Sequence, residues 1–222
     1  MITRDERRVA AAILAGGQAR RMGGTNKATL QVGELRIVDR QLTLLRQVAD
    51  PVFIVSSAHH EAFSPLGIDV VPDAIPEAGP LGGIYTALVS SPHPRTLVVA
   101  CDMPFLTLPL LHHLTRDTQA DVVIPRSAAG YEPLCAVWST AAADTIRRRI
   151  ECGQLKAGLV VEELRVEEIG PEVLASCDPH GLLFVNVNTP HDYERAQGLS
   201  RLESKSSKDR IIDVSGPGPK PA

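Results

Sequence analysis

The sequence lacks the features of a membrane protein and of a basic nucleic-acid-binding protein. None of its apolar runs approaches the roughly 20 residues that a membrane-spanning helix needs, so we expect no membrane partner. Its 23 lysines and arginines are outnumbered by 26 acidic residues, which leaves no overall basic field to hold nucleic acid. A negatively charged ligand must therefore be bound by a local cluster of positive side chains.

The sequence also lacks the closely paired cysteines of zinc and dithiol sites. Its four cysteines are Cys101, Cys135, Cys152 and Cys177, far apart from one another. Isolated cysteines of this kind are typical of a reducing compartment, so we predict a cytoplasmic protein. The apolar run at residues 9–15 is short and leads into glycines and arginines, which does not fit a secretory signal peptide.

Short β-branched segments alternate with segments of helical periodicity. Five continuously apolar segments, the pattern of parallel strands buried on both faces, begin at Val9, Pro51, Ile68, Arg95 and Ala120. Apolar residues at helical spacing follow Ile37, Pro80 and Thr107. This alternation predicts an α/β fold of three layers, in which a doubly wound, mainly parallel sheet lies between helices.

The regular alternation loosens after Pro125. We predict a strand from Tyr131 to Ser139, then a helix, and then a strand over the segment LLFVNVN and a turn before a final helix that starts with Pro190. From residue 200 the chain is rich in Ser, Lys, Arg, Gly and Pro, a composition that cannot bury enough apolar surface to stay ordered. Residues 1–199 are therefore predicted to form one domain, and residues 200–222 a flexible tail.

The loop after the first predicted strand is rich in glycine and basic residues, with the sequence AGGQARRMGGTNK. In an open α/β sheet, ligands bind beyond the carboxyl ends of the strands, and this loop is a common phosphate site. Glycines let backbone N–H groups approach an anion, while Arg21 and Lys27 add full positive charges. We predict a cradle for a nucleotide triphosphate; the alternative is a surface loop whose basic residues are solvated.

This loop is neither of two familiar phosphate-binding motifs. Asn26 precedes Lys27 and Ala28 follows it, which excludes a P-loop, and the dinucleotide motif G-x-G-x-x-G is absent. The segment LAGGQARRMGGTNKATL instead closely resembles the signature of the nucleotidyltransferases that act on the molybdenum cofactor, in particular the MobA-like molybdenum cofactor guanylyltransferases. The resemblance extends over roughly residues 9–196 and implies a Rossmann-like nucleotide-binding half in a nucleotide-diphospho-sugar transferase-like fold.

The resemblance assigns roles to the residues of this loop. It implies that phosphate is bound by Arg21, Gly24 and Lys27, and that the guanine of GTP is held by Leu14, Ala15, Gly16 and Gly17. Relatives that use cytidine nucleotides usually have Ala in place of the second glycine. The family often has an Asn near the guanine after the second strand, whereas this sequence offers Ser56 and Ser57.

Asp102 follows the predicted strand TLVVA, in the segment CDMPF. A carboxylate at a strand's carboxyl end suits Mg²⁺, which usually takes one or two carboxylates together with substrate phosphates. Read alone, Asp102 could equally cap the helix that starts near Thr107. The resemblance implies the metal, because C-D-x-P is the family's metal-binding motif, and it makes Arg21, Lys27 and Asp102 the catalytic residues.

Two further segments carry polar residues of interest. Asp73 ends another predicted strand before Gly79, and alone these residues fit a turn with a close helix–sheet contact; the resemblance implies that both contact GTP. Asn186 and Asn188 would share one face of the predicted strand LLFVNVN, and alone they fit an edge strand or turn. The resemblance implies that Asn186 and Asn188 bind the acceptor.

The resemblance implies transfer of GMP from GTP to the terminal phosphate of molybdopterin, or of molybdenum-molybdopterin, with release of pyrophosphate and with Mg²⁺ as cofactor. Residues 9–125 would then bind the nucleotide and residues 126–199 the acceptor, with transient contacts to molybdoenzymes or their chaperones. Two alternatives stay open: a nucleotidyltransferase that uses CTP or a sugar-phosphate acceptor, and a nonenzymatic nucleotide-binding delivery protein.

Overall fold

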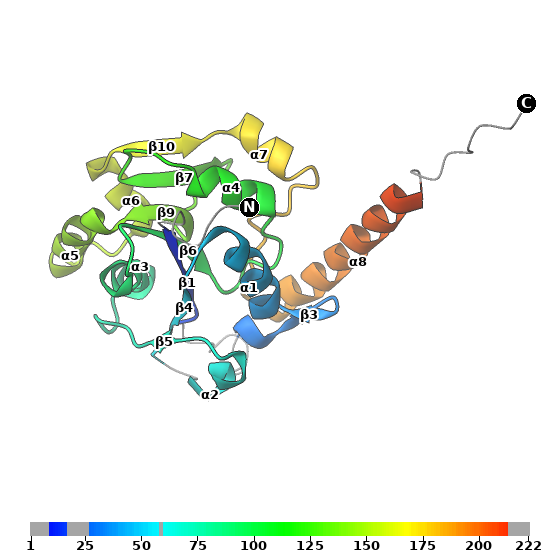
Figure 1. The fold of residues 1–222 in the computed structure, drawn as a ribbon, viewed down its shortest axis with the longest axis horizontal. Helices are drawn as coiled ribbons and strands as arrows, with labels where there is room; N and C mark the ends of the chain where they lie inside the picture. The colour runs from blue at the N-terminus through cyan, green and yellow to red at the C-terminus, as the bar shows by residue number, and fades with distance from the viewer. Residues whose placement is uncertain (1–8, 17–26, 58–59, 213–222) are drawn as a thin grey trace, which may run out of the picture.

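A single sheet runs through the centre of the molecule (Figure 1). The structure is a computed structural model that describes residues 9–16, 27–57 and 60–212. From one edge to the other, the sheet contains β10 (Val166–Ile169), β7 (Val122–Ser127), β9 (Cys135–Ser139), β6 (Arg95–Ala100), β1 (Val9–Leu14), β4 (Val52–Val55) and β5 (Val70–Val71). A short strand, β8 (Gly130–Tyr131), pairs with β7.

The sheet is mainly parallel, as predicted. Strands β6, β1, β4 and β5 run parallel to one another, and β10 runs parallel to β7. Only β9, which lies between β6 and β7, is antiparallel to both of these neighbours among the strands on the sheet's main path. The carboxyl ends of β6, β1, β4 and β5 therefore meet at one edge of the sheet, where ligands bind in folds of this kind.

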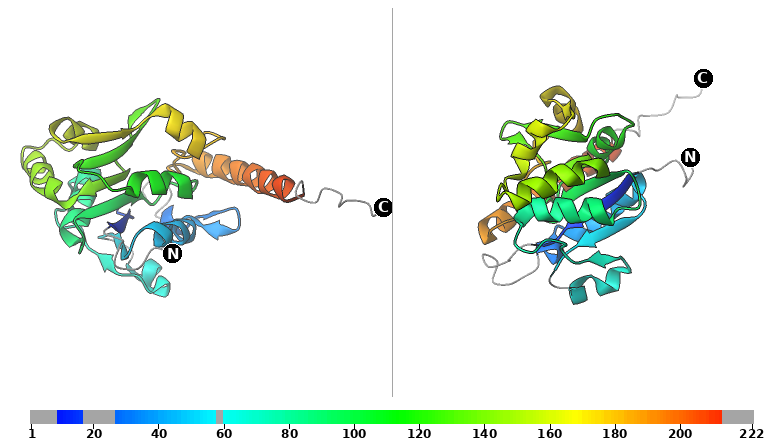
Figure 2. Two further views of the ribbon diagram at one scale, coloured as in Figure 1. Left: turned by 45° about the horizontal axis from the view of Figure 1, so that its top comes forward. Right: turned by 90° about the vertical axis from the view of Figure 1, so that its left-hand side faces the viewer.

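Helices cover both faces of the sheet, which confirms the three-layer prediction (Figures 1 and 2). One face packs against α1 (Ile37–Val48), α4 (Leu108–Thr115) and α7 (Pro171–Cys177). The other face packs against α3 (Gly79–Ser90), α5 (Ala143–Glu151) and α6 (Ala157–Val160). Strand β1 is buried along its whole length because its alternate side chains enter these two cores.

Helix α8 (Pro190–Ile212) projects from this body as a long rod, visible in orange and red in Figures 1 and 2. Its first turns pack against the two-stranded hairpin β2 (Gln31–Val32) and β3 (Leu35–Arg36). The Gln197 amide donates to the Gln31 carbonyl at 2.7 Å and accepts from the Gly33 N–H at 3.1 Å. Within the described part of the chain, no helix is both long enough and apolar enough to cross a membrane.

Short helices make up the remaining regular structure. They are η3 (Lys27–Thr29), α2 (His60–Phe63), η4 (Ser64–Leu66), η5 (Thr140–Ala142) and η6 (Val161–Glu163). The strand predicted from Tyr131 to Ser139 is two strands, β8 and β9, because Pro133 falls between them and cannot donate a ladder hydrogen bond.

Two predictions about the C-terminal part were wrong. The segment LLFVNVN forms no strand, since its backbone groups bond to separate segments: the Leu183 N–H donates to the Asp178 carboxylate and the Val187 N–H to the Asp102 carbonyl. The region predicted as a flexible tail is helical over residues 200–212. No Gly or Pro interrupts residues 199–212, and Leu, Glu, Lys and Arg favour a helix there.

Candidate active site

The predicted site residues gather at the carboxyl edge of the sheet. Strands β1 and β6 are parallel neighbours, and the pairing continues past their ends, where the Cys101 N–H donates to the Leu14 carbonyl at 3.1 Å. Ala15 extends β1 in the same way toward β4, donating to the Val55 carbonyl at 2.9 Å. The backbone ladder therefore fixes Leu14, Ala15 and the loop that begins at Cys101 relative to one another.

Three segments far apart in the sequence bring Lys27, Asp102 and Asn188 together. The Lys27 Nζ lies 3.9 Å from the Asp102 Oδ2 and donates a hydrogen bond to the Asn188 Oδ1 at 2.5 Å. One residue before Asn188, the Val187 N–H donates to the Asp102 carbonyl at 2.9 Å. A cation, a carboxylate and an amide thus share one place beside the loop that was predicted to hold phosphate.

The Asp102 carboxylate is largely buried, with 18% of its side chain exposed. Burial raises the pKa of Asp102 above its usual value, the positive charge of Lys27 opposes this, and Asp192 adds a smaller raising effect. A buried carboxylate that Lys27 compensates only in part favours a further cation at this place. The alternative role as a helix cap is not observed, because no side chain caps α4 and its N-cap residue is Thr107.

The described residues fit a metal ion that is bound jointly by the protein and the substrate, rather than one enclosed by protein ligands alone. Among them, no group of three or more His, Cys, Asp or Glu side chains could hold a metal ion. Asp102 supplies a single buried carboxylate next to a lysine. This donor set suits a hard divalent cation that takes its remaining ligands from phosphate oxygens and water, as Mg²⁺ does.

Asp73 lies at the end of β5 and is held by Ser57. The Ser57 hydroxyl donates to the Asp73 Oδ2 at 2.7 Å and accepts from the Asp73 N–H at 2.8 Å. A Cβ placed on Gly16 would lie 3.2 Å from the same Oδ2, so the end of β1 and this carboxylate are in tight contact. Ser57, which stands in the region where the family often has an Asn, therefore orients Asp73; Ser56 is buried and donates weakly to the Ala15 carbonyl.

Helix α3 begins at Gly79, whose φ of +60° suits glycine. A Cβ on Gly79 would meet open space, whereas a Cβ on Gly83 would lie 3.0 Å from the Leu14 side chain and one on Gly82 would lie 2.6 Å from the Ala78 Cβ. The close helix–sheet contact suggested by the sequence is therefore made by Gly83, with Gly82 packed against Ala78. Gly79 itself leaves the start of α3 accessible.

Asn186 and Asn188 do not share a face. Their segment is irregular, so the two-residue repeat of a strand does not apply. Asn188 bonds to Lys27, while Asn186 is exposed and faces a groove on the other side of the segment. The prediction that both asparagines point the same way was wrong. Gly17, Arg21 and Gly24 lie outside the described residues.

Asp192 is a residue of this region that the sequence analysis missed. Its Oδ2 accepts hydrogen bonds from the N–H groups of Asn188, at 3.1 Å, and Thr189, at 2.8 Å, and the Asp192 N–H donates to the Thr189 hydroxyl. The pKa of Asp192 lies below its usual value, chiefly because the Thr189 side chain hydrogen-bonds to its carboxylate, and the N–H groups of Asn188 and Thr189 add to this effect. The signal was present as a capping box, T-x-x-D, at the start of the final helix.

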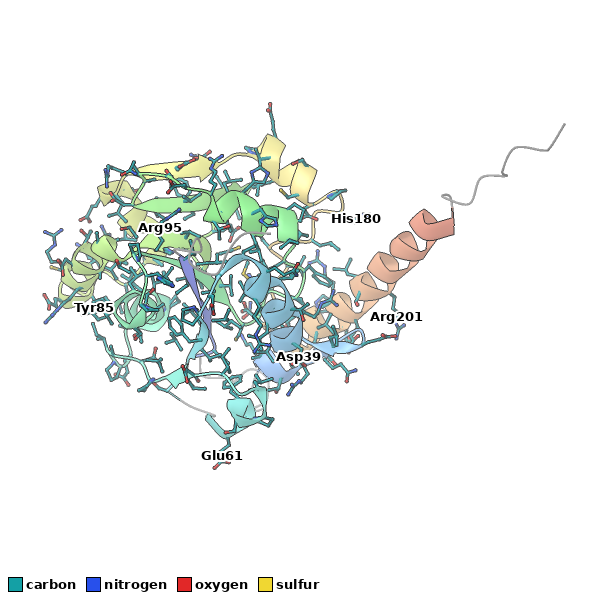
Figure 3. All side chains as sticks on the ribbon, viewed as in Figure 1. Asp39, Glu61, Tyr85, Arg95, His180 and Arg201 are labelled. Carbon is teal, nitrogen blue, oxygen red and sulfur yellow. The ribbon has the colours of Figure 1, made fainter. Side chains whose placement is uncertain are left out.

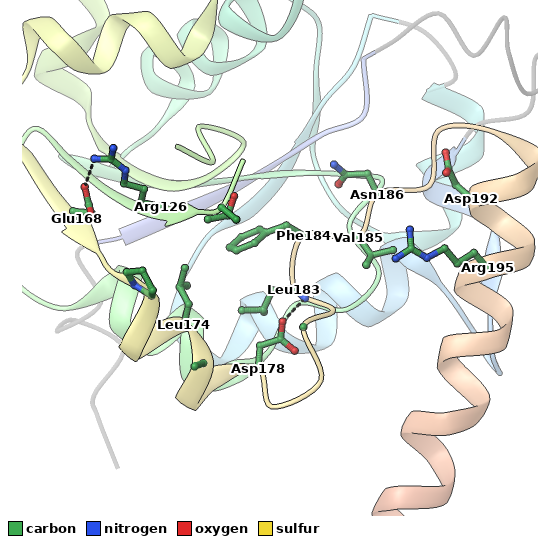
Figure 4. A pocket seen from close by; sticks show the side chains of 15 residues that line it. Arg126, Glu168, Leu174, Asp178, Leu183, Phe184, Val185, Asn186, Asp192 and Arg195 are labelled. Atoms are coloured by element: carbon green, nitrogen blue, oxygen red, sulfur yellow. Dashed lines mark hydrogen bonds and ion pairs between the residues drawn. The ribbon is translucent and has the colours of Figure 1, made fainter. Parts of the chain in front are cut away.

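The groove that Asn186 faces has a volume of about 850 Å³ (Figure 4). Asn186, Asp192 and Arg195 lie at one end, and Arg126 and Glu168 lie at the other. The first end is linked to Lys27 through Asn188, which bonds to both Asp192 and Lys27. Apolar side chains line the stretch between them: Leu174, Leu183, Phe184 and Val185. The groove is therefore polar at its two ends and mainly apolar in its middle, where the Asp178 carboxylate accepts from the Leu183 N–H.

The open α/β sheet, with a lysine and a buried carboxylate beyond neighbouring parallel strands, defines a nucleotidyltransferase of the nucleotide-diphospho-sugar transferase fold. Residues 11–167 match the family model described as a MobA-like NTP transferase domain. The chain belongs to this family. Nucleotidyltransferases of this family generally act with a divalent metal ion.

Similar proteins extend the match beyond that domain. A probable molybdenum cofactor guanylyltransferase from Pelotomaculum thermopropionicum is 36% identical, over 85% of this chain and 91% of that protein. A molybdenum cofactor guanylyltransferase from Desulfosudis oleivorans is 34% identical, over 83% and 92%. The crystal structure of molybdopterin-guanine dinucleotide biosynthesis protein A from Archaeoglobus fulgidus has a TM-score of 0.72 and 28% identity, covering 86% of this chain and 97% of that one.

Proposed function

We propose that the protein transfers GMP from GTP to the terminal phosphate of molybdopterin, or of molybdenum-molybdopterin, and releases pyrophosphate. The names of relatives at 34–36% identity support this reaction. The single observation that carries it is the convergence of Lys27, Asp102 and Asn188 at the carboxyl edge of the sheet. A lysine and a buried carboxylate at this edge suit the transfer of a phosphate-bound group.

In this reaction an oxygen of the acceptor phosphate attacks the α-phosphorus of GTP in line, and pyrophosphate leaves. The attacking oxygen already carries negative charge, so no side-chain nucleophile is needed. Mg²⁺ bound to Asp102 would neutralise charge on the phosphate oxygens. Lys27, whose Nζ is oriented by Asn188, would stabilise the charge that develops on the triphosphate, and we assign the same role to Arg21.

We assign the nucleotide to residues around the end of β1. Leu14, Ala15, Gly16 and Gly17 would hold the guanine. Asp73, oriented by Ser57, would accept from a ribose hydroxyl or a base N–H. Gly24 in the loop and Gly79 at the open start of α3 would approach the phosphates with their backbone N–H groups.

We extend the proposal to the organisation of the chain. Residues 9–125 would form the nucleotide half and residues 126–199 the acceptor half of one domain, with Asn186 and Asn188 on the acceptor side. Contacts with molybdoenzymes or their chaperones would be transient. The four cysteines are free thiols, and one of them, Cys152, is exposed, which supports a reducing cytoplasmic location.

The test of the chemistry uses GTP labelled in its α-phosphate, with molybdopterin and Mg²⁺ supplied. Asp102→Ala and Lys27→Ala should each slow GMP transfer by about 10²–10³-fold, the usual cost of removing one electrostatic contact from a transition state. Asp121→Ala and Lys156→Ala are the matched controls. Asp121 pairs with Arg165 before β7, at the opposite edge of the sheet, and Lys156 is exposed before α6. Undiminished transfer in both site variants would refute the assigned roles.

The base is tested separately by thermal unfolding with each nucleotide triphosphate and Mg²⁺. A ligand that binds only the folded state raises the midpoint by mass action, so GTP should raise it more than CTP or ATP at equal concentration. A larger shift with CTP would make the protein a cytidylyltransferase. Absence of pyrophosphate release with any pterin acceptor would favour a nonenzymatic delivery protein.

A further inference from the structure

The groove described above is distinct from the place proposed for GTP. Its lining includes Asn186 and Asp192, but none of the described residues assigned to the nucleotide, such as Gly16, Asp73 and Gly79. It begins beside the reacting groups, because Val187 and Asn188, which follow Asn186 directly, bond to Asp102 and Lys27. A ligand in the groove would therefore reach Asp102 and Lys27 along a surface that these nucleotide residues do not line.

Arg195 places a positive charge at this inner end of the groove. It stands one helical turn after Asp192 on α8, and its guanidinium points toward Val185 and the groove (Figure 4). Arg195 makes no hydrogen bond or ion pair with the described residues. The neighbouring Asp192 Oδ2 is already occupied by the N–H groups of Asn188 and Thr189. Arg195 is thus a free guanidinium, which can bind two phosphate oxygens at once.

The rest of the groove suits a flat heterocycle with a polar edge. Leu174 and Leu183 are buried and Phe184 is half-buried in its wall, so the middle offers apolar contact. At the far end, Arg126 pairs with Glu168 at 3.3 Å, and these two side chains supply donors and an acceptor. The order of these surfaces is an inner end with Arg195, Asn186 and the already bonded Asp192, then a mainly apolar stretch, and then a polar outer end.

We propose that this groove binds the acceptor, with Arg195 holding its phosphate monoester beside Asp102 and Lys27 and the outer end holding a polar heterocycle. The proposal rests on the proposed function, because it takes the groove's ligand to be the second substrate. Arg195 sets specificity for a phosphorylated acceptor. The reaction itself is unchanged: the acceptor phosphate oxygen bonds to the α-phosphorus of GTP as the bond to pyrophosphate breaks.

The test is a thermodynamic cycle in which the Arg195 guanidinium is removed from the protein and the phosphate is removed from the ligand. Binding of molybdopterin and of its dephosphorylated form is measured by thermal shift for the parent, Arg195→Ala and Arg195→Lys. Arg195→Ala should weaken molybdopterin binding by about 10–100-fold, the scale of a charge-assisted hydrogen bond, and should leave binding of the dephosphorylated form within about twofold. Arg195→Lys should restore part of the loss, because it keeps the charge but not the bidentate geometry.

Arg201→Ala is the matched control, since Arg201 is an exposed arginine farther along the same helix (Figure 3). It should bind both ligands as the parent does. In the same Arg195→Ala protein, the KM for GTP should stay within about twofold of the parent value while the KM for molybdopterin rises as binding weakens. Equal weakening of both ligands, or an equal rise in both KM values, would show a merely structural role and overturn the proposal.

The two proposals fail in different ways. If the parent transfers GMP but Arg195→Ala binds and uses molybdopterin normally, the groove assignment falls and the function stands. If the parent binds molybdopterin through Arg195 but transfers no GMP, the function falls and the groove stands. If the parent binds neither pterin, the groove assignment is overturned. If Arg195→Ala weakened binding of GTP alone, the groove would be part of the nucleotide site, and the groove assignment would also be overturned.

Discussion

The two sides of the candidate site are held in place by different means. On the nucleotide side, Leu14, Asp73 and Asp102 stand at or just after the carboxyl ends of β1, β5 and β6, and the sheet ladder fixes those ends. On the acceptor side, Asn188 and Arg195 stand on an irregular segment and on α8. There no strand ladder contributes, and the positions depend on the packing of Val187 and Ala196 against Ile37 and Phe105 and on side-chain hydrogen bonds. One half of the site is thus fixed by backbone pairing and the other by side-chain contacts, which single substitutions weaken directly.

The largest effect is expected when Asn188 and Asn186 are each replaced by alanine in separate variants. Asn188→Ala removes the acceptor of the Lys27 bond, and hydrogen bonds to charged groups contribute about 1.5–3 kcal/mol, so GMP transfer should slow by about 10–100-fold. Asn186→Ala leaves that bond intact and should change the KM for molybdopterin more than kcat. Steady-state kinetics of both variants checks this. Equal effects on kcat would contradict the separation of the two side chains.

The attachment of α8 is tested at Gly33, in the hairpin. A Cβ there would clash with the Ser200 Oγ on a backbone with a φ of +66°, so Gly33→Ala should lower the free energy of unfolding by about 1–3 kcal/mol. Gly153→Ala is the control, because Gly153 has a φ of +72° but open space around it, and it should cost less. Urea unfolding measures both. Equal losses of unfolding free energy in the two variants would mean that the contact between Gly33 and α8 contributes nothing to stability.

On the nucleotide side, Ser57→Ala should have a smaller effect. The variant removes a hydroxyl that both donates to Asp73 and accepts from its N–H, and losing such bonds at an exposed position costs about 1 kcal/mol. We expect the Kd for GTP to rise about fivefold while the KM for molybdopterin stays unchanged. Isothermal titration with GTP checks the first value. A rise in the molybdopterin KM alone would place Asp73 on the acceptor side.

The smallest effect concerns the pH dependence of stability. Burial raises the pKa of Asp102 in the folded protein, so the folded state binds more protons than the unfolded state between the two pKa values, and stability falls as the pH rises through that window. Asp102→Asn should therefore unfold at a higher temperature than the parent at about pH 7, and the gap should shrink as the pH falls toward about 4, near the unfolded carboxyl pKa. Thermal melts across this range measure it.

Asp121→Asn gives the control of opposite sign. The Arg165 side chain lowers the pKa of Asp121, so the folded state favours its charged form, and the variant should be less stable than the parent at about pH 7. This deficit should also shrink on acidification. If Asp102→Asn were also less stable than the parent at about pH 7, burial would not be the dominant influence on the pKa of Asp102.

The sequence predicted the strand-end residues well because strand pairing and chain order place them. The continuously apolar segments that end near Leu14 and Asp102 were recognisable as parallel strands, and such strands end at one edge of the sheet. The roles assigned to these residues stay predictions. Ser57 was considered only as a partner for the guanine, because a hydrogen bond to Asp73 depends on how two loops meet.

The acceptor side could not be predicted in the same way. Alternation of apolar and polar residues at the end of LLFVNVN is typical of a strand, but no neighbouring strand pairs with that segment, so the inferred common face of Asn186 and Asn188 does not exist. Arg195 resembles any charged residue on the exposed face of a helix. Its position over a groove follows from the docking of α8, which is set by contacts between residues more than 160 positions apart.

The docking of Gln197 on the hairpin determines where the C-terminus can be altered. The hairpin follows the short helix η3, which begins with Lys27, so the last part of the polypeptide supports the segment next to that lysine. A purification tag fused after Ile212 sits at the far end of a projecting rod, whereas a stop codon before Gln197 leaves the segment that presents Lys27 without that support. Shortened versions for crystallisation should therefore keep the chain through Ser200.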